Sequence, residues 1–89
     1  MKSYKFKIIG RVQGVYYRAN VDKYASASAF SGYVKNLNDG SVEACVTCSE
    51  ARLDEFIDIL KKGSPTSRVD EIQTHTCDEV FEDGFSIRY

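Results

Sequence analysis

The residues with the clearest chemical potential lie in one stretch, Gly10 to Arg18, which reads Gly-Arg-Val-Gln-Gly-Val-Tyr-Tyr-Arg. Glycine lets the backbone bend so that successive N–H groups converge, and the arginine guanidinium can hold two oxygens of a phosphate or carboxylate. A helix is expected to begin near Ala19, and its N-terminus adds unpaired N–H groups and the positive end of the helix dipole. The stretch therefore predicts a local anion site between a strand and a helix. An ordinary turn with a solvated arginine is the alternative.

The stretch matches neither of two familiar phosphate-binding patterns. It lacks the Gly-Lys-Ser/Thr ending of a Walker A loop and the second and third glycines of the dinucleotide fingerprint. No Ser-His-Asp or Cys-His arrangement and no paired carboxylates accompany it, and the single histidine, His75, falls far along the chain. Chemistry that needs a strong nucleophile or a tuned base is not indicated. An acyl phosphate already has a good leaving group, so positioning and charge neutralisation can suffice for its hydrolysis.

The three cysteines are an odd number, which argues against a disulfide framework. Cys45 and Cys48 form a Cys-x-x-Cys, and His75 and Cys77 lie downstream, which gives four possible zinc ligands. Residues three apart on a strand point to opposite faces, however, so Cys45 and Cys48 are not expected to share a site. We predict no bound metal and interpret the cysteines as small hydrophobic residues or surface thiols.

Composition limits the classes of partner. The 89 residues fit one domain, residues 1–89, and 43% of them are hydrophobic, as in a folded globular protein. The net charge of −1 gives no broad attraction to nucleic acid or an anionic membrane. The N-terminus has no apolar signal core, and no run approaches membrane-spanning length. We therefore expect a cytoplasmic protein, monomeric, with no nucleic-acid or membrane partner.

Hydrophobic periodicity predicts five strands and two helices. Strands are expected at residues 4–9, 32–37, 42–47, 68–76 and 85–89, and helices at residues 19–30 and 50–62. The second helix has the clearest pattern: Leu53, Phe56, Ile57 and Leu60 fall at i, i+3, i+4 and i+7, with Ser49 as the expected N-cap. Asp39-Gly40 predicts the tight reversal between the second and third strands.

The order β-α-β-β-α-β, with a short extra strand at the end, predicts a ferredoxin-like α+β fold. An antiparallel four-stranded sheet would carry both helices on one face. Two binding modules share this topology. An RNA-recognition motif needs exposed aromatic residues on its central strands, and the third strand, 41–47, has none. A metal-carrying domain would place Cys-x-x-Cys after the first strand, where this chain has Gln13-Gly14-Val15.

Two long segments resemble the signatures of the acylphosphatase family. They are Ile8-x-Gly10-x-Val12-Gln13-Gly14-Val15-x-Tyr17-Arg18 and Gly32-Tyr33-Val34-Lys35-Asn36-x-x-x-Gly40-x-Val42, and the likeness extends over nearly the whole chain. The resemblance implies hydrolysis of a small-molecule acyl phosphate to a carboxylate and inorganic phosphate, without metal or cofactor. The phosphate-binding arginine falls on Arg18 and the water-orienting asparagine on Asn36. The loop amides that would cradle phosphate fall on Gln13, Gly14, Val15, Tyr16 and Tyr17. A non-catalytic phosphate- or anion-binding module of the same fold is the alternative.

The chain departs from the family pattern at several positions. Tyr17 stands where phenylalanine is usual, and we expect its hydroxyl to alter the polarity of the site. Ala29 replaces a typical glycine after the first helix and would be strained if that position is left-handed. Cys48 replaces the glycine that closes the second signature. Arg18 and Asn36 are both retained, so activity is expected. The sequence does not distinguish a small acyl phosphate from a phosphorylated protein carboxylate as the natural substrate.

Overall fold

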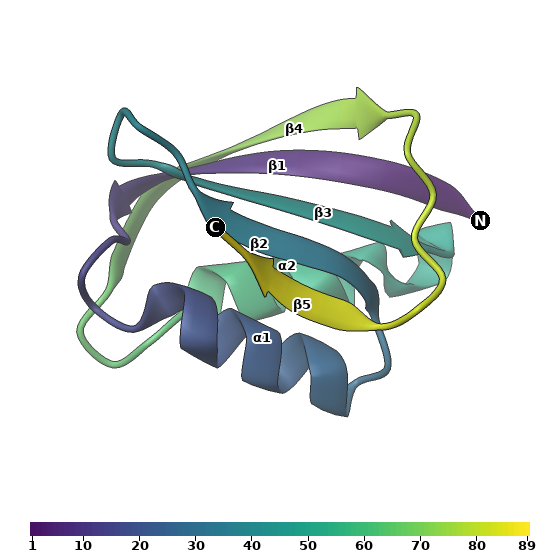
Figure 1. Cartoon of the computed structure of the whole chain (residues 1–89), viewed down its shortest axis with the longest axis horizontal. Coiled ribbons are helices and arrows are strands. Elements are labelled where there is room, and N and C mark those ends of the chain that lie inside the picture. The colour runs from purple at the N-terminus through teal and green to yellow at the C-terminus, as the bar shows by residue number, and fades with distance from the viewer.

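Two helices cover one face of a five-stranded sheet in the computed structural model, which describes residues 1–89 (Figure 1). The strands are β1 (Lys2–Arg11), β2 (Ser31–Asn36), β3 (Val42–Cys48), β4 (Arg68–Cys77) and β5 (Phe85–Arg88). The helices are α1 (Tyr17–Ala27) and α2 (Leu53–Lys62), with a short 3-10 turn, η1 (Glu50–Arg52), before α2. The predicted ferredoxin-like order is confirmed.

The strand order across the sheet is β4-β1-β3-β2-β5. The four longer strands pair antiparallel, as predicted, with Phe6 opposite Ala44 and Val34 opposite Ala44 on its other side. β5 adds to the outer edge of β2 in the parallel direction, with Gly32 opposite Phe85. The complete sheet is therefore mixed, and this parallel pair places the C-terminal residues beside the end of β2.

Helix α1 begins earlier and ends earlier than the predicted 19–30. Tyr17 and Arg18 form its first turn, because the Tyr17 side chain is buried and draws the chain into the helix. At the other end Ala29 takes a left-handed conformation with φ 61°. The Phe30 N–H donates to the Ala25 carbonyl at 3.0 Å, and the Ala29 N–H donates to that of Ser26 at 3.1 Å. These two bonds form a Schellman motif, so the predicted strain at Ala29 is confirmed.

The predicted N-cap of the second helix is wrong in its detail. Ser49 precedes the 3-10 turn η1, and its side chain makes no capping hydrogen bond. Helix α2 begins only at Leu53 and ends at Gly63, where φ is 50° and the N–H donates to the Ile59 carbonyl. A glycine that ends the helix agrees with the prediction.

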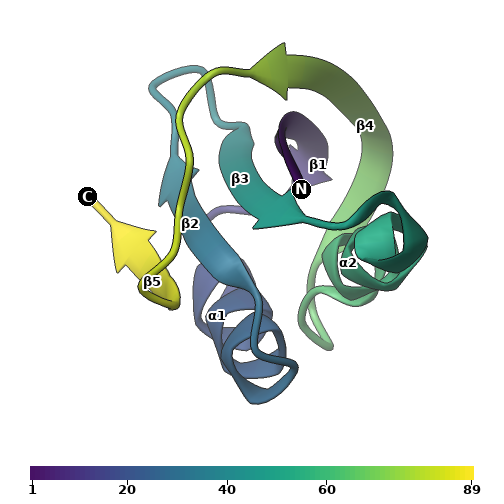
Figure 2. The ribbon, with the colours of Figure 1, turned by 90° about the vertical axis from the view of Figure 1, so that its right-hand side faces the viewer.

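The core lies between the sheet and the two helices, as the end-on view shows (Figure 2). Phe56 of α2 is at its centre, with ring centroids 5.7 Å from Phe6, 5.2 Å from Phe30 and 5.9 Å from Phe85. Helix α1 contributes Val21 to the same core. Neither helix has the length and apolarity that crossing a bilayer requires.

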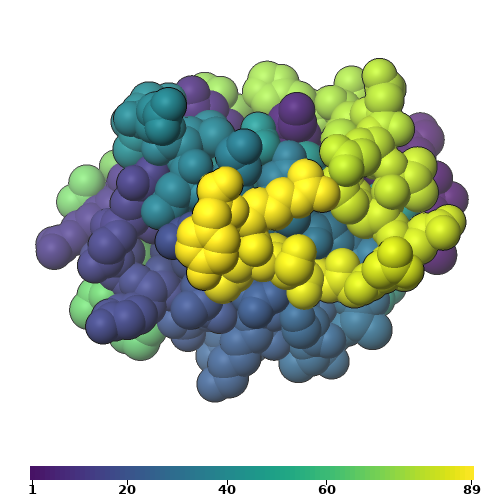
Figure 3. All heavy atoms as spheres, viewed as in Figure 1, coloured from purple at the N-terminus to yellow at the C-terminus, as the bar shows by residue number.

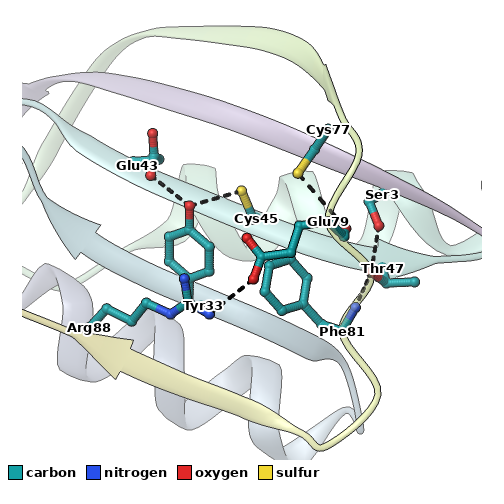
Figure 4. Close-up of polar contacts among 9 residues, drawn as sticks. All are labelled: Ser3, Tyr33, Glu43, Cys45, Thr47, Cys77, Glu79, Phe81 and Arg88. Atoms are coloured by element: carbon teal, nitrogen blue, oxygen red, sulfur yellow. Dashed lines mark hydrogen bonds and ion pairs between the residues drawn. The ribbon is translucent and has the colours of Figure 1, made fainter.

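The segment 78–84 connects β4 to β5 across the sheet face opposite the helices (Figures 2 and 4). The Phe81 N–H donates to the Thr47 hydroxyl at 2.9 Å, and the Phe81 ring lies 5.5 Å from that of Tyr33. The Arg88 guanidinium lies 4.0 Å from the centre of the Tyr33 ring and forms an ion pair with Glu79. These contacts fix β5 against β2 from the outer face.

Candidate active site

The loop between β1 and α1 carries a continuous row of unpaired backbone donors. The N–H groups of residues 13–19 donate to no backbone or side-chain acceptor. Gly14 and Tyr16 both take left-handed conformations, with φ 73° and 62°, which bends the loop. The buried side chains of Val12 and Val15 anchor it to the core. Successive free N–H groups that lead into a helix N-terminus are the layout that favours anion binding, which stays a prediction for this loop.

Arg18 adds a positive charge that no carboxylate neutralises. It lies in the first turn of α1, and none of the ion pairs in the structure includes it. One Nη donates weakly to the Arg88 carbonyl at 3.4 Å, and the guanidinium carbon lies 5.0 Å from the centre of the Tyr89 ring. The C-terminal residues thus support the guanidinium without competing for its charge, which leaves it available to a phosphoryl group.

Asn36 is the last residue of β2, and its side-chain oxygen Oδ1 is buried without a hydrogen-bond partner. A buried unpaired acceptor is uncommon, because leaving one unsatisfied costs free energy. Asparagine can accept a hydrogen bond from a water through its side-chain oxygen. The missing partner is compatible with the role that the resemblance implies for Asn36.

A single cleft of about 430 Å³ brings these groups together. Its lining comprises Val12, Gly14, Tyr16, Tyr17, Arg18, Ala19, Asn36, Ile87 and Tyr89. Of the predicted site residues, Gly14, Tyr16, Tyr17, Arg18 and Asn36 lie in this lining, whereas Gln13 and Val15 do not. The C-terminal residues cover the surface on one side, drawn in yellow in Figure 3. Ile87 and Tyr89 were not anticipated as lining residues from the sequence.

Gln13 has a role that the sequence analysis missed. Its side-chain nitrogen Nε2 donates to the carbonyls of Leu37 and Ser41, both at 2.8 Å. These carbonyls belong to the hairpin connection that follows Asn36. The Gln13 side chain therefore ties the loop to the hairpin connection that follows Asn36. No local pattern signals this contact, because its partners lie far along the chain.

The Tyr17 hydroxyl is not part of the cleft. It donates to the Leu60 carbonyl at 2.7 Å, and burial raises the pKa of Tyr17 above its ordinary value. A Cβ on Gly63 would lie only 2.7 Å from the Tyr17 ring, which shows how closely α2 ends against it. The expectation that this hydroxyl alters the polarity of the site is wrong, because the hydroxyl faces the end of α2.

Cys45 and Cys48 lie on opposite faces of the sheet, as the two-residue period of a strand predicted. Cys48 belongs to the core beneath the helices, whereas Cys45 Sγ lies 3.3 Å from the Tyr33 hydroxyl on the outer face (Figure 4). Burial raises the pKa of the Cys45 thiol to about 11, so it is not poised as a thiolate ligand. No three His, Cys, Asp or Glu side chains come together anywhere in the structure. Metal independence stays a prediction.

Comparison with known proteins now identifies the family. The acylphosphatase family model matches residues 4–87. The chain belongs to the acylphosphatase family. An acylphosphatase from Caldivirga maquilingensis is 43% identical over 90% of this chain and 86% of its own length. One from Methanocella arvoryzae is 34% identical over 99% of this chain and 100% of its own. The crystal structure of acylphosphatase from Bacillus subtilis superimposes with a TM-score of 0.90 at 37% identity, covering both chains completely.

The match extends over whole chains in sequence and in structure. The chain is therefore an acylphosphatase-type hydrolase, and the catalytic interpretation is supported over a binding module without activity.

Proposed function

We propose that this chain hydrolyses the carboxyl–phosphate bond of small-molecule acyl phosphates, with Arg18 and Asn36 as its catalytic residues. The observation that carries the proposal is their common cleft. Arg18, Asn36 and four residues of the donor row, Gly14, Tyr16, Tyr17 and Ala19, all line it. Each of these groups is a donor, a charge or an acceptor that lacks a strong partner within the protein.

The phosphoryl group fits against the loop, where the free N–H groups and Arg18 neutralise its oxygens. Charge builds up on those oxygens as the transition state forms, and preorganised donors stabilise it without reorganisation. The Arg18 fork adds two parallel hydrogen bonds of fixed geometry. The Gln13 side chain ties this loop to the hairpin connection that follows Asn36.

Asn36 supplies orientation for the nucleophile. A water held by the Asn36 side chain presents a lone pair to phosphorus, and its oxygen forms the new P–O bond as the bond to the carboxyl oxygen breaks. The carboxylate leaves without a proton because the pKa of its conjugate acid, about 4 for a carboxylic acid, lies well below neutral pH. Both protons of the water remain with the inorganic phosphate product. The step therefore requires no histidine, and none lines the cleft.

We further propose that the chain acts as a monomer in the cytoplasm, without metal or cofactor. The near balance of charges, with a net charge of −1, favours no nucleic-acid or membrane partner.

The test is hydrolysis of acetyl phosphate by purified protein in the presence of excess chelator. We expect turnover that chelation leaves unchanged and that Arg18→Ala abolishes. Arg18→Lys keeps the charge but loses the two-pronged geometry, so both affinity and rate should fall. Tyr24→Ala, on α1 but outside the cleft, is the matched control and should leave turnover intact. A parent protein that binds phosphate yet releases none from acetyl phosphate would instead be an anion-binding module.

A further inference from the structure

The Asn36 side chain depends on its backbone for its position in the cleft. Its Oδ1 is buried without a hydrogen-bond partner, so no bond to a neighbouring group holds that oxygen in place. Asn36 is also the last residue of β2, and its pairing with Val42 is the last of the β2–β3 ladder. The contacts that hold the connection after this pair therefore bear directly on where the Asn36 amide lies.

The connection after Asn36 lacks one of the two hydrogen bonds that would continue the ladder. The Leu37 N–H donates to the Ser41 carbonyl at 2.9 Å, as in an antiparallel pair. The Ser41 N–H does not return this bond, because it donates to the Asp39 carboxylate at 2.9 Å. Within the connection, only the Gly40 N–H reaches the Leu37 carbonyl, at 3.3 Å. The Leu37 carbonyl can therefore accept a better donor from elsewhere in the chain.

The Gln13 side chain supplies that donor. Its Nε2 donates to the Leu37 carbonyl and to the Ser41 carbonyl, both at 2.8 Å, which are short N–H···O bonds. One amide thus bridges the two sides of the hairpin at the point where the ladder ends. Both hydrogens of the amide are used, so a side chain without an NH₂ group cannot make the same bridge.

Gln13 does not contact the reacting groups through its side chain. It is absent from the cleft lining, although its neighbour Gly14 belongs to that lining. Its amide is instead directed to the peptide carbonyls that follow Asn36. Any contribution of this side chain to the reaction must therefore pass through the residues that it holds.

We propose that Gln13 is a positioning residue for the hydrolysis: its amide holds the peptide after Asn36, so that the Asn36 side chain meets the attacking water in the reactive geometry. The inference rests on the proposed function, since it concerns how the same cleft places the water. A displacement of about 1 Å at a positioned group can lower a rate on the order of 10²-fold. Loss of the Gln13 amide should reduce turnover rather than substrate binding, because Arg18 and the loop N–H groups remain.

The experiment measures kcat and KM for acetyl phosphate in the parent, Gln13→Met, Asn36→Ala and the double variant. Methionine is close to glutamine in length but has no donor. We expect Gln13→Met to lower kcat about 10- to 100-fold, with KM changed by less than about twofold. In the Asn36→Ala background the same substitution should lower kcat by less than about twofold, because residues that act as a unit are not additive. Gln73→Met is the matched control on β4, since the Gln73 amide donates to Glu71 at 3.0 Å outside the cleft, and it should match the parent.

Equal losses of kcat in the two backgrounds would overturn the inference, because Gln13 would then act independently of Asn36. Weaker binding of inorganic phosphate to Gln13→Met, measured by calorimetry, would also overturn it, since the side chain would then support the phosphate loop. If Gln13→Met does not fold, Gln13→Asn takes its place in the same cycle. Asparagine keeps a polar amide but is one methylene too short to reach both carbonyls, so the same pattern is expected.

A second measurement does not depend on turnover. Amide NMR relaxation gives the backbone order parameters of Asn36 and Leu37 in the parent and in the two Gln→Met variants. We expect these values to fall in Gln13→Met and to stay unchanged in Gln73→Met. Absence of hydrolysis by the parent would contradict the proposed function, whereas unchanged order parameters in Gln13→Met would contradict the positioning role of Gln13.

Discussion

Replacement of Asn36 by alanine should separate catalysis from stability. In the proposed mechanism the Asn36 side chain orients the attacking water, an interaction that matters mainly in the transition state. Removing one preorganised group of this kind lowers kcat on the order of 10²–10³-fold. KM should change little, because the phosphoryl group is held by Arg18 and the loop N–H groups, which the substitution does not touch.

The expected effect on stability has the opposite sign from that of most core substitutions. The Asn36 side chain makes no hydrogen bond within the protein, and its buried Oδ1 has no partner. An unsatisfied buried acceptor costs about 1–3 kcal/mol. Alanine removes this cost but also gives up the packing of a half-buried side chain, so the free energy of unfolding should stay constant or rise by up to about 1 kcal/mol.

The assay pairs urea unfolding with steady-state kinetics on acetyl phosphate, for the parent and Asn36→Ala. Urea unfolding reports the free-energy difference through the midpoint if the slope is unchanged. Isothermal titration with inorganic phosphate provides the control, since binding should largely survive the substitution. A fall in stability of more than about 1 kcal/mol together with lost activity would show that Asn36 supports the hairpin rather than the water. Turnover at the parent rate would remove Asn36 from the mechanism.

Four further predictions concern the loop, the first helix and the pH dependence. Inorganic phosphate should stabilise the parent protein against urea, by about 2.7 kcal/mol at a hundred times its dissociation constant, and Arg18→Ala should remove this gain relative to chloride at equal ionic strength. Ala29→Gly should raise the free energy of unfolding by about 1 kcal/mol, because φ of 61° strains alanine but not glycine; an unchanged urea midpoint would contradict the reasoning. The Lys7 ammonium and the Ser41 N–H and hydroxyl lower the pKa of Asp39. The Asp39 carboxylate should therefore stabilise the fold above the ordinary carboxyl pKa and lose this contribution as the pH falls through its lowered pKa. The urea midpoints of the parent and Asp39→Asn should accordingly converge in acid. Turnover should depend only weakly on pH between about 5.5 and 7.5, since no histidine lines the cleft, and a limb near pH 6.5 that His75→Ala abolishes would reveal a missed general base.

The residues that line the cleft come from segments far apart in the sequence. Arg18 and the free N–H groups come from the loop and first turn of α1, Asn36 from the end of β2, and Ile87 and Tyr89 from β5 and the residue after it. The residues proposed to bind phosphate and to orient the water therefore come from separate elements, and β5 with the residue after it completes the lining.

The element order and the fold class were readable from the sequence, because periodicity and turn residues are local signals. Alternation over residues 4–9 and the spacing of Leu53, Phe56 and Leu60 indicated which faces would be buried. Over residues 42–47 the alternation predicted one buried face, but Cys45 and Thr47 on the other face are buried as well. The start of α1 was not readable, since Tyr17 in its first turn is buried against a distant segment and bonds to the Leu60 carbonyl of α2. The parallel pairing of β5 with β2 likewise arises from packing between distant segments.

The sequence likewise predicted one part of the candidate site, and the tertiary structure supplied the rest. Glycine spacing and the arginine after it predicted an anion-binding loop, and the two family signatures singled out Arg18 and Asn36. Only the tertiary structure showed that both border one cleft, that Gln13 fixes the loop to the hairpin, and that Ile87 and Tyr89 complete the lining. The physical reason is the range of the interactions. Backbone conformation and helix dipoles act within a few residues of one another, whereas a cleft exists only where side chains from separate elements pack against each other.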